Sequence, residues 1–107
     1  MELTLIALTP ADPVAVRLPD RRRIIDLLWA AAGPGERLEH VSAQVGPQDI
    51  RLGLFTVATP ELTAGAAALA ICRRALAISP PLSGWRIAGE PSLRQDVIRH
   101  TTRQEHP

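Results

Sequence analysis

Three consecutive arginines, Arg21, Arg22 and Arg23, form the densest group of like charges in this sequence. Guanidinium groups bind carboxylates and phosphates through paired hydrogen bonds, so this run is a candidate docking site for an anion, an acidic partner or nucleic acid. The competing interpretation is a solvated helix face on which Arg22 pairs with Asp26 one turn later. A nucleic-acid reader normally adds stacking aromatic side chains, and this chain has only three aromatic residues. We therefore do not expect nucleic acid as the partner.

His40 and Ser42 are the residues that most resemble a catalytic base and its nucleophile. They lie two positions apart in an alternating segment, which places their side chains about 7 Å apart on one face of a strand. That separation is too long for a direct hydrogen bond, and the neighbouring acid, Glu39, points to the other face. The two residues are therefore expected to be polar residues of an exposed sheet face.

The cysteine and histidine content predicts no metal site and no cofactor. Cys72 is the single cysteine, and His100 and His106 lie in the C-terminal tail, so no metal-ligand spacing is present. Cys72 is expected to be a small core residue. A lone cysteine forms no intramolecular disulfide, which favours a reducing compartment, and no apolar run is long enough to cross a bilayer. We expect a cytoplasmic protein without a membrane segment.

Length and charge indicate one small domain without a strong electrostatic preference. The chain has 107 residues, a hydrophobic content of 46% and a net charge of +1. A domain of this size buries about 60–70% of its unfolded surface, so association with a second chain is an effective source of extra stability. The twelve basic residues are all arginine and there are sixteen alanines, a composition typical of a GC-rich bacterial genome.

Hydrophobic patterning predicts six elements in the order β-α-β-β-α-β. Asp20 and Gly33 bracket the first helix as N-cap and C-terminal stop, and Thr59-Pro60-Glu61 resembles the start of the second. Residues 11–19 alternate between prolines, and both a strand and a loop stay open there. The expected elements are strands 2–8, 38–45, 50–58 and 85–89 and helices 21–32 and 60–78.

This order predicts an α+β protein, specifically a ferredoxin-like two-layer sandwich with a four-stranded antiparallel sheet and both helices on one face. Residues 1–90 form the expected domain. Residues 91–107 are expected to form a C-terminal extension, a short helix followed by a frayed tail. The topology resembles that of dimeric ferredoxin-like enzymes of the antibiotic-biosynthesis monooxygenase kind, although no sequence motif carries that resemblance.

The central hairpin predicts an uncovered apolar sheet face. If Val45 pairs with Ile50 across the Gly46–Asp49 loop, then Ile50, Leu52 and Leu54 face the core. The outer face then carries Arg51, Gly53, Phe55 and Val57 together with His40, Ser42 and Gln44. The first strand adds a further apolar set to that face. This set is either Thr4, Ile6 and Leu8 or Leu3, Leu5 and Ala7.

The second helix is apolar almost all the way round. On a helical wheel, Leu62, Gly65, Ala66, Leu69, Cys72 and Leu76 form one side, which we expect to pack on the sheet. The opposite side carries Ala64, Ala67, Ala68, Ile71, Ala75 and Ile78. Alanine tolerates exposure, but Ile71 and Ile78 favour contact with a second subunit or with the C-terminal segment.

These features predict a non-enzymatic, self-associating protein-interaction module, an accessory or regulatory subunit that forms a homodimer, sheet to sheet. The expected interface residues are Phe55, Val57, Ile71, Ile78 and Trp85.

Two alternatives stay open. One is a small-molecule-binding dimer, a cofactor-free monooxygenase or cyclase, with a pocket formed by His40, Trp29, Phe55 and Trp85. The other is docking of an acidic partner or nucleic acid through Arg21–Arg23.

Overall fold

The fold is α+β, with one antiparallel sheet of four strands and two helices. The computed structural model describes residues 1–12 and 17–95, with side chains as far as Gly89. The elements are β1 (Glu2–Pro10), α1 (Arg21–Ala31), the 3-10 turn η1 (Pro34–Glu36), β2 (Leu38–Val45), β3 (Ile50–Thr56), α2 (Ala64–Ile78), the 3-10 turn η2 (Pro80–Leu82) and β4 (Trp85–Gln95). The predicted order of strands and helices is confirmed.

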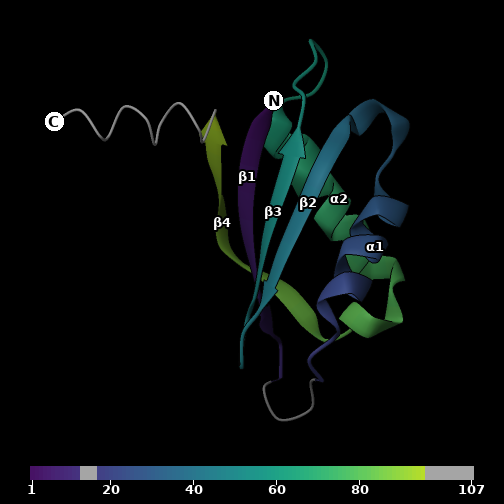
Figure 1. Ribbon diagram of the computed structural model, residues 1–107, viewed down its shortest axis with the longest axis vertical. Coiled ribbons are helices and arrows are strands. Elements are labelled where there is room, and N and C mark those ends of the chain that lie inside the picture. Colours follow the sequence, from purple (N-terminus) through teal and green to yellow (C-terminus); the bar gives the residue numbers. More distant parts are fainter. Residues whose placement is uncertain (13–16, 96–107) are drawn as a thin grey trace, which may run out of the picture.

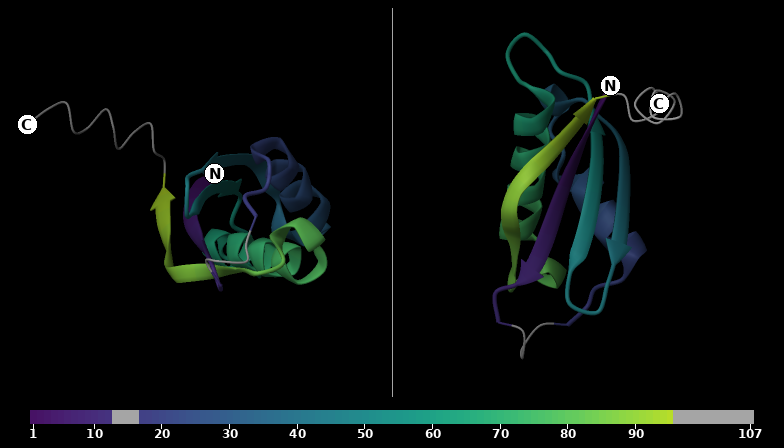
Figure 2. Two further views of the ribbon diagram at one scale, coloured as in Figure 1. Left: turned by 90° about the horizontal axis from the view of Figure 1, so that it is seen from below. Right: turned by 90° about the vertical axis from the view of Figure 1, so that its left-hand side faces the viewer.

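The strands lie in the order β2-β3-β1-β4, and every neighbouring pair is antiparallel. Both helices pack on the same face of the sheet (Figures 1 and 2), where their buried side chains join those of the strands in one core. The other face carries no element of the described chain. Two layers thus give the sheet one buried face and one uncovered face.

The β2–β3 hairpin has the predicted register. Val45 pairs with Ile50, and Gly46 N–H donates to the carbonyl of Asp49 at 2.8 Å to close the loop. Ile50, Leu52 and Leu54 consequently point into the core. The strict alternation of β2 determines this register, because a one-residue slip would turn every apolar side chain outward.

Strand β1 resolves the two alternatives for its faces. Thr4, Ile6 and Leu8 point into the core, so Leu3, Leu5 and Ala7 lie on the outer face. The polar Thr4 is fully buried and the apolar Leu5 is exposed, which is the reverse of what their polarity alone predicts. Pairing with β3 imposes this choice. Thr4 lies directly opposite Leu54, and residues opposite each other in a sheet point to the same face, so Thr4 points into the core with Leu54. Strand β1 ends at Pro10, and residues 17–20 contain no strand.

Strand β4 is longer than predicted. It continues to Gln95 and pairs with β1 up to Glu2, so residues 91–95 are strand and do not begin a helical extension. Between Ala88 and Ser92 the register shifts, and Gly89 takes a left-handed φ of 64°. The strand bends sharply there (Figure 2). The remainder of the predicted extension, residues 96–107, lies outside the described residues.

Helix α1 begins at Arg21 as predicted, because its N-cap is local, and ends at Ala31, one residue earlier than predicted. The Asp20 carboxylate accepts hydrogen bonds from the backbone N–H groups of Arg22 and Arg23 at 3.1 and 3.3 Å. Ile24, Leu28 and Ala31 form the buried stripe. The predicted Arg22–Asp26 ion pair is not formed in the described structure.

Helix α2 begins later than predicted, at Ala64. Thr59 and Leu62 exchange backbone hydrogen bonds and close a turn, and Thr63 caps the helix by accepting from Ala66 N–H at 3.2 Å. The turn uses the N–H and C=O groups that a helix starting at Pro60 would have needed. The predicted end at Ile78 is confirmed.

The predicted faces of α2 were wrong. The side that packs on the sheet carries Ala64, Ala67, Ala68, Ile71, Cys72 and Ala75. Leu69 and Leu76 are only half-buried and lie beside β4. Alanines suit the buried side because their small side chains allow the helix backbone to approach the sheet closely.

Candidate functional site

The outer face of the sheet holds the candidate site. Leu5 projects from β1, a central strand, and no helix of the described chain covers it; 36% of its surface is exposed. Leu3 and Ala7 on the same strand and Phe55 on β3 are half-buried on this face. Leu3, Leu5 and Phe55 are neighbours on this face, and a contiguous apolar patch often marks an interaction site.

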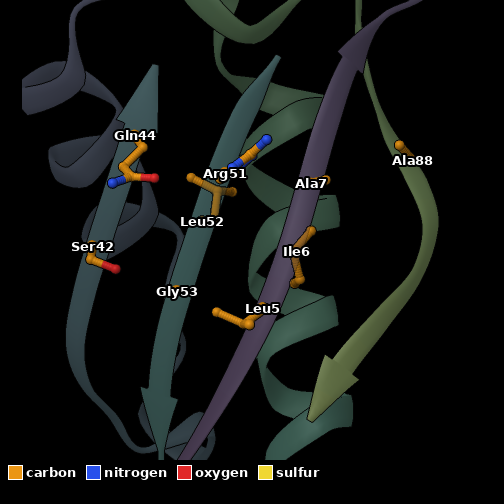
Figure 3. A pocket seen from close by; sticks show the side chains of 9 residues that line it. All are labelled: Leu5, Ile6, Ala7, Ser42, Gln44, Arg51, Leu52, Gly53 and Ala88. Carbon is orange, nitrogen blue, oxygen red and sulfur yellow. The ribbon is translucent and has the colours of Figure 1, made fainter. Parts of the chain in front are cut away.

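A depression of about 490 Å³ lies in the middle of this face. Figure 3 shows it spanning all four strands; its polar side chains come from β2 and β3, and β1 and β4 contribute apolar side chains alone. Its lining residues are Leu5, Ile6, Ala7, Ser42, Gln44, Arg51, Leu52, Gly53 and Ala88.

Gly53 forms the floor of the depression. A Cβ atom at this position would lie 2.6 Å from Ser42 Oγ and 3.2 Å from Leu3 Cδ1. Any side chain there would displace its neighbours and fill the space between β2 and β1. The absence of a side chain at Gly53 therefore lets the side chains of Ser42 and Leu3 come close over its backbone, which is buried.

The polar rim combines a positive charge with two neutral hydrogen-bonding groups. Arg51 lies opposite Gln44 in the hairpin, and its Nε donates to Asp49 Oδ2 at 3.2 Å. Ser42 lies opposite Gly53. The Ser42 hydroxyl, the Gln44 carboxamide and the Nη groups of Arg51 have no hydrogen-bond partner in the described structure. The rim can therefore donate several hydrogen bonds to an external acceptor.

His40 and Phe55 lie together but outside the depression. Their rings contact each other across the β2–β3 pair, with centroids 5.6 Å apart and planes tilted by 55°. No hydrogen bond joins His40 to Ser42 in the described structure. This pairing of two outer-face rings adds apolar surface next to Leu3.

The four residues predicted to form a pocket do not meet around one cavity. Trp29 is exposed on α1, and Trp85 is buried in the core beneath β4. Neither reaches the outer face that carries His40 and Phe55. The prediction of a shared pocket between them was wrong, because it grouped aromatic side chains from opposite layers.

The predicted interface residues also divide between the layers. Phe55 and Val57 are half-buried at the outer face and its margin. Ile71 and Trp85 belong to the core, so they offer no surface to a partner. Ile78 is exposed at the end of α2, on the helical layer. The assignment of Ile71 and Trp85 to an interface is therefore corrected: both stabilise the chain itself.

The arginine run lies at the start of α1, and all three side chains are exposed. None of the three forms an ion pair within the described part of the chain. The helix N-terminus repels cations, so this placement does not stabilise the helix. Arg21 lies near the hairpin loop and borders a shallow groove there with Asp49 and Arg51.

Cys72 is a core residue, as predicted. Burial raises the pKa of its thiol to about 12, so the thiol stays protonated at neutral pH and is a poor nucleophile. Among the described residues no three His, Cys, Asp or Glu side chains are grouped as metal ligands would be. No helix in residues 1–12 and 17–95 has the length and hydrophobicity needed to span a membrane.

Ser42, Gln44 and Arg51 were predicted to lie on the outer face, but the depression they surround was not predicted. The glycine inside an otherwise apolar strand was the available signal, since such a residue often marks a close approach. Its partner Leu5 comes from β1, more than forty positions away. Comparisons with protein-family models, with curated proteins and with solved structures found no match for this chain.

Proposed function

We propose that this chain is a non-enzymatic, self-associating module that forms a homodimer through the outer face of its sheet and acts as an accessory or regulatory subunit. The observation that carries the proposal is Leu5, which is exposed at the centre of a sheet face that no described element covers. Leu3, Ala7 and Phe55 surround it with further apolar surface. A cytoplasmic location, based on the lone buried cysteine, belongs to the same proposal.

A ferredoxin-like classification is part of this proposal. The strand order, read from the other edge, is β4-β1-β3-β2, so each strand-helix-strand unit leaves room for one strand between its two strands. Both helices lie on one face (Figure 2). These features support a split β-α-β arrangement repeated twice. In such a two-layer fold the chain itself leaves the second sheet face uncovered, so this face is available to a second copy.

The size of the face is compatible with a dimer that dissociates on dilution. Four strands spaced about 4.8 Å apart and some seven residues long present a flat footprint of roughly 440 Å² per copy. The two copies together then bury roughly 900–1,200 Å² once side-chain relief is included, the lower end of specific interfaces. We therefore expect a dissociation constant in the micromolar range and not an obligate dimer.

The test is the solution mass of the full chain, measured by light scattering over a dilution series. The wild type is expected to approach twice the chain mass at high concentration and to fall toward it at low micromolar concentration. Leu5→Glu and Phe55→Glu place a charge in the pairing face, and each is expected to give a monomer at all concentrations.

Ile78→Glu is the matched control, because Ile78 is exposed on the helical layer. This variant is expected to dimerise like the wild type. A wild-type chain that stays monomeric at every concentration would refute the homodimer, and so would a dimer that both outer-face variants retain.

A second candidate, docking of an acidic partner through Arg21–Arg23, is supported by three exposed guanidinium groups without a carboxylate partner in the described structure. Such docking depends on long-range charge attraction. Binding to a polyglutamate peptide is expected to weaken at least tenfold between about 50 and 300 mM salt and to disappear when all three arginines are replaced by alanine. Salt-independent binding, or none by the wild type, would rule it out.

A further inference from the structure

We propose that the depression in the outer sheet face binds a small carboxylate with an apolar body, and that the second copy closes over it. The closure rests on the proposed homodimer, whereas recognition of the acid rests on the residues of one chain. The juxtaposition that carries the proposal is an arginine hydrogen-bonded to Asp49 at one end of the depression and an apolar wall at the other (Figure 3).

Arg51 is arranged to receive an anion. Its Nε donates to Asp49 Oδ2 at 3.2 Å, which orients the guanidinium plane and leaves both Nη groups without a partner in the described structure. Two Nη groups on one edge of a guanidinium match the two oxygens of a carboxylate. Because Asp49 already holds the Nε–H of Arg51, the side chain loses less conformational entropy when the acid binds.

Ser42 and Gln44 complete the polar side. They alternate along β2 and border the depression with Arg51 on the neighbouring strand. The hydroxyl and the carboxamide each supply a donor and an acceptor, and neither is used within the described structure. They are placed to bind a carboxylate oxygen or a polar substituent close to it.

The opposite side fits an apolar group. Leu5, Ala7 and Ala88 form the apolar wall on β1 and β4. The depression of about 490 Å³ is within the range of small-molecule sites. A ring or branched chain of several carbons would bury its surface against Leu5 while its carboxylate meets Arg51.

A second copy would convert the open depression into an enclosed chamber. With 73% of its side chain exposed, Arg51 of an isolated chain interacts with an anion through a screened, water-filled space. A second sheet face placed over the site excludes water and strengthens the same charge pair. Ligand binding and dimerisation are therefore expected to promote each other.

The experiment is a titration of the full-length chain with 3-phenylpropionate, followed by calorimetry and by light scattering on the same samples. The uncharged 3-phenylpropanamide serves as ligand control. We expect the acid to bind at least tenfold more tightly than the amide, and Arg51→Gln to remove that difference while leaving the fold intact. Arg86→Gln is the matched variant, because Arg86 is an exposed arginine of β4 that does not line the depression.

The outcomes separate the ligand from the dimer. A dimer that binds the acid no more tightly than the amide, or shows no heat with either up to about 10 mM, overturns the carboxylate site and leaves the homodimer standing. A monomer that binds the acid through Arg51 supports the site and overturns both the closure and the homodimer. Equal loss in Arg86→Gln and Arg51→Gln also overturns the site, because it shows general charge attraction.

Discussion

Replacing Ile71 by alanine is expected to lower the free energy of unfolding by about 3 kcal/mol, whereas the same change at Ile78 alters it by less than about 0.5 kcal/mol. The two residues lie two turns apart on α2. Ile71 is 0% exposed and packed in the core, and Ile78 is 65% exposed. Losing three carbons at Ile71 removes transfer free energy and leaves a cavity that the rigid sheet cannot fill.

The measurement is urea denaturation of the three proteins at one concentration, well below that at which the wild type dimerises. Low concentration removes any contribution of a second subunit, so the difference reports the chain's own core. Equal effects at the two positions would contradict the packing of α2 described above. A loss at Ile71 that appears only in dimeric samples would restore its original assignment to an interface.

The orientation of α2 shows why periodicity alone misassigned these residues. A helical wheel locates a buried stripe only when polar residues occupy the remainder, and α2 has apolar residues on nearly every side. The larger side chains, Leu69 and Leu76, lie on the side that was expected to pack on the sheet. The close approach of helix and sheet selects small residues instead, and that distance is a property of the tertiary structure.

The sequence pattern of strand β1 likewise does not show which of its two faces is buried. Both its odd-numbered and its even-numbered residues are mostly apolar, and the buried set includes Thr4 while the outer set includes Leu5. Side-chain polarity alone would have placed Leu5 in the core and Thr4 on the outer face. The hairpin, by contrast, was predicted correctly, because β2 alternates cleanly and the loop length fixes the pairing of Val45 with Ile50. Local patterns determined the hairpin, and long-range pairing determined β1.

The candidate site depends on the same long-range pairing. The polar rim could be assigned to one face from the hairpin alone, since Ser42, Gln44 and Arg51 follow its alternation. The apolar wall requires β1 to lie beside β3 and β4 to lie beside β1. Neither contact is encoded in a short segment, so only half of the depression was predictable from the sequence.

Replacing Glu36 by glutamine is expected to lower the free energy of unfolding by about 2 kcal/mol at pH 7. Glu36 is 8% exposed, and its carboxylate accepts hydrogen bonds from Gly33 N–H at 2.6 Å and from both Nη groups of Arg74 at 2.9 and 3.0 Å. Arg74 also donates to the carbonyl of Ala31. One ion pair thus joins the end of α1, the η1 turn and α2, and glutamine keeps the shape but loses the charge.

The same ion pair predicts how this difference depends on pH. The hydrogen bonds from Arg74 outweigh the effect of burial, so the pKa of Glu36 in the folded chain lies below its ordinary value of 4.5. A carboxyl group with a lowered pKa stabilises the fold fully above its unfolded pKa and loses this contribution as the pH falls through the folded pKa. The stability gap between wild type and Glu36→Gln should therefore be constant above about pH 5.5 and should close on acidification below about 4.5.

Urea denaturation of both proteins across pH 3–7 measures this gap, with Glu61→Gln as the matched control. Glu61 is exposed and has no ion-pair partner in the described structure, so its variant should follow the wild type at every pH. Subtracting the control removes the general effect of acid on all other carboxyl groups. Parallel profiles of wild type and Glu36→Gln down to pH 3 would show that the charge of Glu36 contributes nothing, and that its hydrogen bonds alone hold the η1 turn against α2.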